Sequence, residues 1–170
     1  MADLTANPIV TALASGRPEA YAALYERVSR PMMKVATVML GHSQGAEDAV
    51  QDVFLELVRH REVLHRVRDL DSYLFAMLRH AVGRRLARER QERQKLQNSP
   101  SHTTAKSAEF LPDELNGALQ SLPPDQREVI ALKIDGELTF AQIGEVLRIS
   151  PNTAASRYRY ALEKLRRKLE

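Results

Sequence analysis

The sequence has no cysteine and no tryptophan, and glycine, proline and aromatic residues are all scarce among its 170 residues. Without cysteine the chain forms no disulfide, binds no metal through thiolates and has no cysteine nucleophile, and it fits a reducing compartment. Glycine and proline are too few for a turn-rich β-sandwich, whereas the abundant alanine, leucine, arginine, glutamate and glutamine favour helix. We therefore expect an all-α protein.

Segments that would direct the chain to or through a membrane are also missing from the sequence. No apolar run approaches the ~20 residues that span a bilayer. The first ten residues lack a basic segment followed by an apolar one, which is the pattern of a signal peptide. The sequence therefore predicts a cytoplasmic protein without a membrane partner.

Residues that could build a catalytic or metal centre do not gather in the sequence. No glycine-rich phosphate loop is present, and the adjacent carboxylates of Glu47 and Asp48 would point in different directions on a helix. We expect no metal, no cofactor and no enzymatic activity, and a protein that acts by binding. The histidines do not pair at the i, i+3 or i+4 spacing of a helical metal site: His42, His60, His65, His80 and His102.

Charge is segregated along the chain, although the formal net charge is only +3. Residues 44–57 contain four acids and no base, whereas residues 79–95 contain seven bases and two acids. Residues 155–170 form a second basic block, with six bases and two acids. Two basic blocks indicate two contacts with a polyanion, although either block alone could equally be a solvated helix face.

The segment around residues 97–112 separates two parts of the chain. It is rich in serine, threonine, asparagine and proline and has no apolar periodicity, which is typical of a linker. We predict two small helical domains joined by a flexible linker. The boundaries are residues 1–96, a linker at 97–111, and residues 112–170.

The N-terminal part is expected to contain four helices. The first begins at Pro18, and Pro31 is expected to break it and to open a second helix that ends at Gly41. A third begins at Ala46 and has one apolar face. Its opposite face is acidic with a leucine in the middle, a combination that favours a protein partner over simple solvation. That face comprises Asp48, Gln51, Asp52, Leu55 and Glu56.

A polar stretch at residues 59–70 precedes a long fourth helix, which we expect Asp71 or Ser72 to cap and to run to about Lys95. One side of this helix is apolar. The other side mixes small residues with arginines, so a backbone could approach closely while the charges hold it, as in nucleic-acid binding. The alternative is a solvated basic helix end, which the helix dipole favours.

The C-terminal part is expected to contain four helices, the last two forming a helix-turn-helix. Thr139 caps the short third helix, a tight turn follows, and Ser150-Pro151 opens a longer basic helix. Gly144 is small where these helices lie close together. In this motif the start of the second helix enters the major groove of DNA. There it offers side chains that hydrogen-bond to bases or phosphates: Asn152, Thr153, Ser156, Arg157 and Arg159.

Two stretches resemble the sigma-70 family of bacterial transcription initiation factors, in its extracytoplasmic-function (ECF) type. AEDAVQDVFLELV at residues 46–58, followed by DSYLFAMLRHAVGRRLARER at 71–90, is similar to sigma region 2. Residues 119–166, which include LPPDQREVIAL and LTFAQIGEVLRISPNTAASRYRYALEKLR, are similar to region 4. The two regions in this order, across a short linker, are highly specific to that family.

The resemblance implies a role for each part of the chain. The acidic face of the third helix, Asp48, Gln51, Asp52, Leu55 and Glu56, would bind the β′ clamp helices of core RNA polymerase, and the β flap is a second part of the polymerase that the protein would contact. Residues 61–72 match a loop that captures an unstacked base of the −10 promoter element. An anti-sigma factor is a further partner that the resemblance allows. The helix after the loop would contact −10 DNA through Arg79, His80, Arg84, Arg88 and Arg90, and the last helix would read −35 DNA through Asn152, Thr153, Ser156, Arg157 and Arg159.

Several positions depart from the family pattern. His80 stands where asparagine is usual, Arg84 near a common aspartate, and Ala155 where a cation is frequent. The common Glu-Ile-Ala of region 4 is Gln142-Ile143-Gly144. These changes bear on base preference at the −10 element and on the phosphate contacts of the last helix.

Two other functions are consistent with parts of the pattern. A helix-turn-helix regulator could bind an operator without joining polymerase, but it would need a dimer to read paired half-sites, and no clean dimerisation heptads are present. A nucleic-acid-processing enzyme would need a metal or nucleophile cluster. The family resemblance further implies that binding core polymerase frees the DNA-reading faces from each other or from an inhibitor.

Overall fold

The computed structural model describes residues 7–96 and 111–170, and every regular element in these ranges is helical. The predicted all-α class is therefore confirmed. Most of the expected linker, residues 97–110, lies outside the described residues. The elements, in chain order, are α1 (Pro8–Ala14), α2 (Pro18–Leu40), α3 (Ala46–Arg59), the 3-10 helix η1 (Arg61–Arg66), α4 (Leu70–Leu96), α5 (Asp113–Gln120), α6 (Pro124–Ile134), α7 (Phe140–Leu147) and α8 (Pro151–Leu169).

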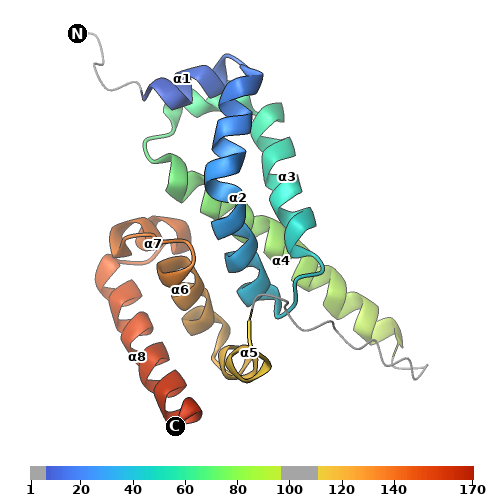
Figure 1. Ribbon diagram of the computed structural model, residues 1–170, viewed down its shortest axis with the longest axis vertical. Helices are drawn as coiled ribbons and strands as arrows, with labels where there is room; N and C mark the ends of the chain where they lie inside the picture. Colours follow the sequence, from blue (N-terminus) through green and yellow to red (C-terminus); the bar gives the residue numbers. More distant parts are fainter. Residues whose placement is uncertain (1–6, 97–110) are drawn as a thin grey trace.

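The N-terminal bundle is built on α2, α3 and α4, which pack against one another (Figure 1). The apolar face predicted for α3 is its buried face: Val50, Val53 and Leu57 are at most 2% exposed. Phe54, at the edge of this face, packs edge-to-face on Tyr25 of α2 with ring centroids 5.1 Å apart. Helical spacing alone therefore located the contact between α3 and its neighbours.

The prediction that Pro31 breaks the helix that begins at Pro18 and opens another is wrong, because α2 continues through Pro31 from Pro18 to Leu40. A proline inside a helix removes one backbone hydrogen bond and crowds the preceding turn. In α2, buried side chains on both sides of the proline, including Val28, Met32 and Val35, hold the helix against the bundle. Since tertiary packing supplies most helix stability in proteins, it outweighs this local cost.

Two helical elements of the N-terminal bundle were not predicted. In α1, the Asn7 side chain accepts a hydrogen bond from the Ile9 amide at 3.0 Å and Pro8 occupies the first turn. This Asn-Pro cap is a helix-start signal that the sequence carried. The 3-10 helix η1 lies in the polar stretch at residues 59–70, where Leu64 is fully buried and fixes the loop to the bundle.

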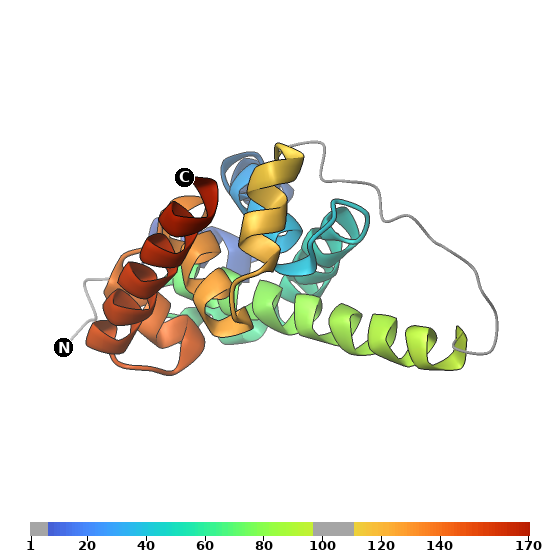
Figure 2. The same cartoon turned by 90° about the horizontal axis from the view of Figure 1, so that it is seen from below.

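The cap of the long helix also differs from the prediction. The α4 helix begins at Leu70, and Asp69 accepts a hydrogen bond from the Ser72 amide at 2.7 Å. Asp69 is therefore the capping residue, in place of Asp71 or Ser72. The C-terminal half of α4 extends away from the other helices (Figure 2).

The helix-turn-helix forms as predicted. Thr139 accepts a hydrogen bond from the Gln142 amide, and the Gln142 side chain accepts one from the Thr139 amide, which completes a capping box. Arg148 in the turn has a left-handed backbone with φ of 55°. The Ser150 hydroxyl accepts from the Thr153 amide and caps α8.

Gly144 fits the turn because it has no side chain. A Cβ atom at Gly144 would lie 2.7 Å from the backbone oxygen of Ile149 and 3.4 Å from the Pro151 nitrogen. Both neighbours belong to the backbone of the turn, so neither can move aside by changing a rotamer. The close approach expected at this position is confirmed, and it is to the turn between α7 and α8.

The two bundles pack on each other, and buried apolar side chains from both form one cluster. The α6 helix lies against α2, and α7 lies against α4 (Figure 1). Two α5 side chains add hydrogen bonds to the end of α2: Gln120 donates to the Val38 carbonyl at 2.9 Å and Asn116 to the Gly41 carbonyl at 3.3 Å. The described residues thus show two helical bundles in a closed arrangement.

Candidate protein and nucleic-acid interfaces

The acidic face of α3 is on the surface of the N-terminal bundle. Leu55, at its centre, is 54% exposed, so a large apolar side chain stands in solvent among carboxylates. Glu56 lies 3.8 Å from the Arg84 guanidinium of α4. The carboxylates of Asp48 and Asp52 lie 3.5 and 3.7 Å from the Arg85 guanidinium, which is also on α4. The structure therefore brings the predicted core-binding residues onto one face, whose edge is paired with α4.

Arg85 is a residue that the sequence reasoning missed. Its side chain is only 21% exposed and reaches two carboxylates of α3, and its Nε atom is buried without a hydrogen-bond partner. The signal was present in the sequence, since Arg85 sits among arginines, but helical spacing does not reveal which arginine turns inward. Its ion pairs fix the position of α3 relative to α4.

The predicted −10 residues lie along α4 and differ in their surroundings. His80, Arg84, Arg88 and Arg90 are exposed. Arg79, by contrast, donates through Nε to Glu128 of α6 at 2.6 Å, and the Glu128 side chain is only 13% exposed. One proposed DNA contact is therefore held by the C-terminal bundle in this arrangement.

A second polar contact joins the bundles at the start of α4. The Gln142 side chain donates to both carboxylate oxygens of Asp69, at 3.0 and 3.3 Å. Burial by itself raises the pKa of the Asp69 carboxyl, but hydrogen bonds from Ser72 and Gln142 outweigh it, and the pKa lies below its ordinary value. The cap of the expected −10 helix is thus bound to the capping box of α7.

The predicted −35 residues lie at the start of α8. Asn152, Thr153 and Arg159 are exposed, and Arg159 lies over the ring of the neighbouring Tyr160 at 5.7 Å. The Thr153 hydroxyl is 2.8 Å from that of Ser150 and shares in the cap.

The other two predicted −35 residues, Ser156 and Arg157, are partly buried, and Arg157 contacts α6. Ser156 is half-buried. The Arg157 Nε atom lies 3.4 Å from a carboxylate oxygen of Asp125, which fixes the guanidinium at the side of α8. Asp125 therefore holds a candidate phosphate-binding group, a role that no sequence signal indicated.

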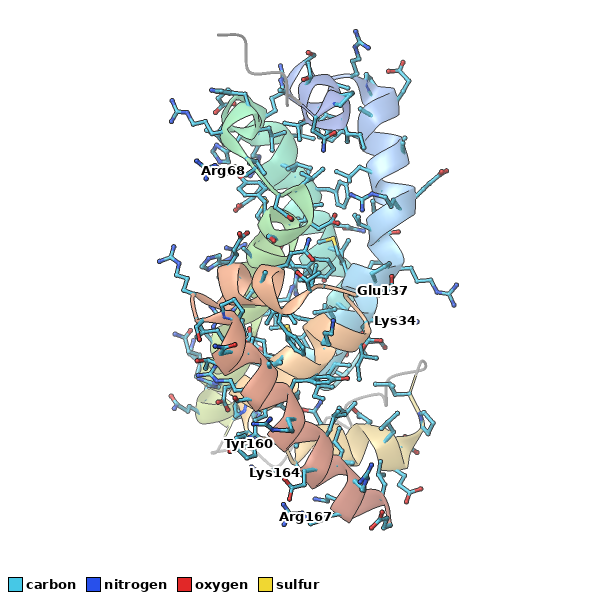
Figure 3. All side chains as sticks on the ribbon, turned by 90° about the vertical axis from the view of Figure 1, so that its left-hand side faces the viewer. Lys34, Arg68, Glu137, Tyr160, Lys164 and Arg167 are labelled. Atoms are coloured by element: carbon cyan, nitrogen blue, oxygen red, sulfur yellow. The ribbon has the colours of Figure 1, made fainter. Side chains whose placement is uncertain are left out.

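The second basic block continues along α8. Tyr160, Lys164 and Arg167 lie on an exposed side of the helix (Figure 3). Arg167 forms an i, i+4 ion pair with Glu163 at 3.2 Å, a type of pair that contributes little in solvent. This side of the helix is therefore a largely solvated basic surface.

Metal-binding geometry is not found in the parts of the chain that the structure describes. No three histidine and carboxylate side chains in residues 7–96 and 111–170 gather as metal ligands would. None of the helices in these residues is long and apolar enough to cross a membrane. Fold and surface together are those of a helical, two-bundle DNA-binding protein with a separate acidic face on α3.

Comparison with known proteins identifies the family. Sigma-70 region 2 matches residues 24–92, and sigma-70 region 4 matches residues 118–167. The RNA polymerase sigma factor CarQ of Myxococcus xanthus is 29% identical over 160 residues, which cover 89% of this chain and 90% of CarQ.

Two solved structures have similar folds, each with a TM-score of 0.69. The sigma factor RpoE from Bartonella quintana, co-crystallised with the anti-sigma factor NepR, is 21% identical and covers 89% of this chain and 97% of its own. CnrH, in complex with the cytosolic domain of CnrY, is 23% identical and covers 95% of this chain and 94% of its own.

The chain belongs to the sigma-70 family and is a sigma factor of the ECF type. As a sigma factor it is a non-catalytic initiation factor that binds core RNA polymerase and directs it to promoters. The family, the function and the absence of enzymatic activity are therefore as the sequence predicted.

Proposed function

We propose that the two bundles divide the work of promoter recognition between them. The N-terminal domain, residues 1–96, binds core polymerase through the acidic face of α3 and −10 DNA through α4. The C-terminal domain, 112–170, reads −35 DNA with the start of α8 and binds the β flap, and residues 97–111 link the two. We further propose that the protein acts in the cytoplasm, where core polymerase and promoters are present.

The observation that carries the docking surface is the position of Leu55. Its side chain is 54% exposed, and the carboxylates of Asp52 and Glu56 flank it on the same face. An apolar centre with a charged rim is the common anatomy of a protein interface. A partner with an apolar pocket ringed by basic residues complements this face.

The contacts between the bundles support a change of arrangement on binding. Arg79 is a proposed −10 contact, but Glu128 holds its guanidinium at 2.6 Å. We propose that core polymerase separates the bundles and so releases Arg79 and the start of α4 for promoter DNA. The RpoE structure contains the anti-sigma factor NepR, which supports the proposal that an anti-sigma factor binds this protein too.

The experiment compares two substitutions of matched chemistry. Leu55→Arg places a charge at the centre of the proposed docking face, and Ile9→Arg places the same charge on α1, where Ile9 is 47% exposed. We expect Leu55→Arg to weaken binding to core polymerase by at least about tenfold, as at an interface hot spot. The control variant should bind core polymerase as the wild type does.

A second measurement separates docking from DNA binding. Asp52→Lys reverses a charge on the docking face and leaves the C-terminal domain unaltered. We expect it to reduce promoter-specific transcription while binding to −35 duplex is retained. Full transcription by both α3 variants would exclude this face as the docking surface.

A further inference from the structure

A cleft of about 750 Å³ lies between the two bundles, along α4 and the start of α6. This volume falls within the ~300–1,000 Å³ range of small-molecule sites. The walls come from α2 and α4 on one side and from α5 and α6 on the other. The cleft therefore exists only while the bundles are together.

The cleft has a strongly positive wall. Arg79, Arg84, Arg90 and Arg93 of α4 face it together with Arg127 of α6. Against these five arginines it contains one carboxylate, that of Glu128, so the formal net charge of its lining is +4. Closing the bundles thus places an arginine of the C-terminal domain beside the basic face of the N-terminal domain.

Most of these arginines already have carboxylate partners, but two have none among the residues that the structure describes. Arg79, Arg84 and Arg93 pair with acids, the last two at 3.8 Å. Arg90 has no such partner, and Arg127 bonds only to the side-chain oxygen of Gln120. Burial lowers the pKa of the Arg127 guanidinium, as expected for a cation that lacks a counter-charge.

Much of the remaining cleft lining is apolar, with His80 and Gln120 as its polar members, and it leaves one position open. Gly83, in the middle of α4, faces the cleft, and a Cβ atom there would meet no atom within 4 Å. A glycine inside a helix costs stability relative to alanine, and no packing contact accounts for this one. The apolar part of the lining is made by Met39, Leu40, Val82, Leu86 and Pro124.

From these features we propose that the interdomain cleft binds a free nucleotide. Its phosphates would contact Arg90 and Arg127, and its base would lie on the apolar lining beside Gly83. Guanidinium groups are the preferred protein partners of phosphate, and a planar base matches an apolar surface of this size. The two unpaired arginines suit the charge of one phosphate monoester or a diphosphate.

The consequence is regulatory and rests on the proposed function. A ligand that contacts α4 and α6 at once binds the closed arrangement better than the separated one, and so favours closure. It also occupies the side of α4 that carries Arg79, Arg84 and Arg90. Nucleotide binding and promoter binding would therefore oppose each other.

The test is direct binding to the full-length protein without polymerase or promoter. Calorimetry would use ADP and GDP as probes, with adenosine, pyrophosphate and a short single-stranded DNA as comparisons. Arg90→Gln, Arg127→Gln and Gly83→Met alter the cleft, and Arg30→Gln, an exposed position on α2, removes the same charge elsewhere. Thermal unfolding would show whether each variant is folded.

We expect a nucleoside diphosphate to bind and each cleft variant to weaken this binding by at least about tenfold. The two arginine variants each lose one charged hydrogen bond, and Gly83→Met fills the open volume. Arg30→Gln should bind as the wild type does. Equal binding of pyrophosphate would overturn the role of the apolar lining. No binding by either nucleotide, or binding by single-stranded DNA alone, would overturn the proposal and leave the assignment of α3 and α8 intact, because transcription assays test those separately.

Discussion

Gly144→Ala places a methyl group against the turn of the helix-turn-helix. Inside a helix, alanine is favoured over glycine by about 1 kcal/mol. At this site, however, the added Cβ would lie 2.7 Å from the Ile149 carbonyl oxygen, which belongs to the backbone. Overpacking of this kind costs about 1–3 kcal/mol. The contact should outweigh the helix preference, and alanine, common here in the family, should destabilise this protein.

The matched control is Gly83→Ala, the same change in the middle of α4. Since a Cβ at Gly83 meets no atom within 4 Å, only the helix preference acts, and we expect a gain of about 1 kcal/mol. For a chain of this size 1 kcal/mol corresponds to about 2–4 °C in Tm. The two variants should therefore shift Tm in opposite directions.

Differential scanning calorimetry of both variants, with −35 duplex binding in parallel, tests this reasoning. Displacement of the turn should also weaken duplex binding by Gly144→Ala, because the turn sets the angle of α8. If Gly144→Ala raised Tm as Gly83→Ala does, the turn would have room for the methyl group. The close approach would then not explain the glycine.

Three further predictions concern stability. Pro31→Ala should restore the missing backbone hydrogen bond in α2 and raise the free energy of unfolding by about 1–2 kcal/mol in urea titrations. An unchanged free energy would show that the proline does not weaken the helix. The Asp69 pKa is lowered in the folded protein, so its stabilising effect is complete above the ordinary value and is lost as pH falls through the folded pKa. In urea titrations across acid pH, the free energy of unfolding of Gln142→Ala should fall less steeply with pH than that of the wild type. The same pH dependence in both proteins would refute the contact. Burial raises the Asp135 pKa, so its ionisation lowers stability as pH rises, and Asp135→Asn should raise Tm at pH 7 but not below the ordinary pKa.

The sequence predicted well whatever depends on short-range pattern. The apolar stripe of α3 and the caps at Thr139 and Ser150 follow from residues three or four positions apart. The family resemblance supplied the roles of the two surfaces. Local signals failed at Pro31, where packing on both sides overrides the proline, and at Leu64, whose burial depends on α1 packing over η1.

Helical spacing alone also misjudges burial at two positions of the C-terminal bundle. Ile134 and Leu162 fall on apolar stripes but are 53% and 40% exposed. Ile134 is the last residue of α6, and Leu162 lies in the part of α8 that carries the second basic block. Helical spacing gives the direction of a side chain around its helix, but a neighbouring element must also be present at that height.

The contacts between the bundles could not be predicted, because each joins residues far apart in the sequence. Asp69 and Gln142 are 73 positions apart, and Arg79 and Glu128 are 49 apart. Gln142 stands where the family commonly has glutamate, and only the amide can donate to the Asp69 carboxylate, since a second carboxylate would repel it. The departure from the family pattern thus becomes explicable once the partner is known.

The strength of this closed arrangement must lie in a limited range if the protein is to work as a sigma factor. The neutral hydrogen bonds to the Gly41 and Val38 carbonyls contribute about 0.5–1.5 kcal/mol each after loss of their bonds to water, and the charged contacts at Asp69 and Arg79 about 1.5–3 kcal/mol each. A partner that binds with nanomolar affinity releases about 12 kcal/mol. A binding free energy of this size exceeds the polar contacts between the bundles. A weak effector that favours closure by a few kcal/mol would shift the same equilibrium measurably, so a site between the bundles is well placed for regulation.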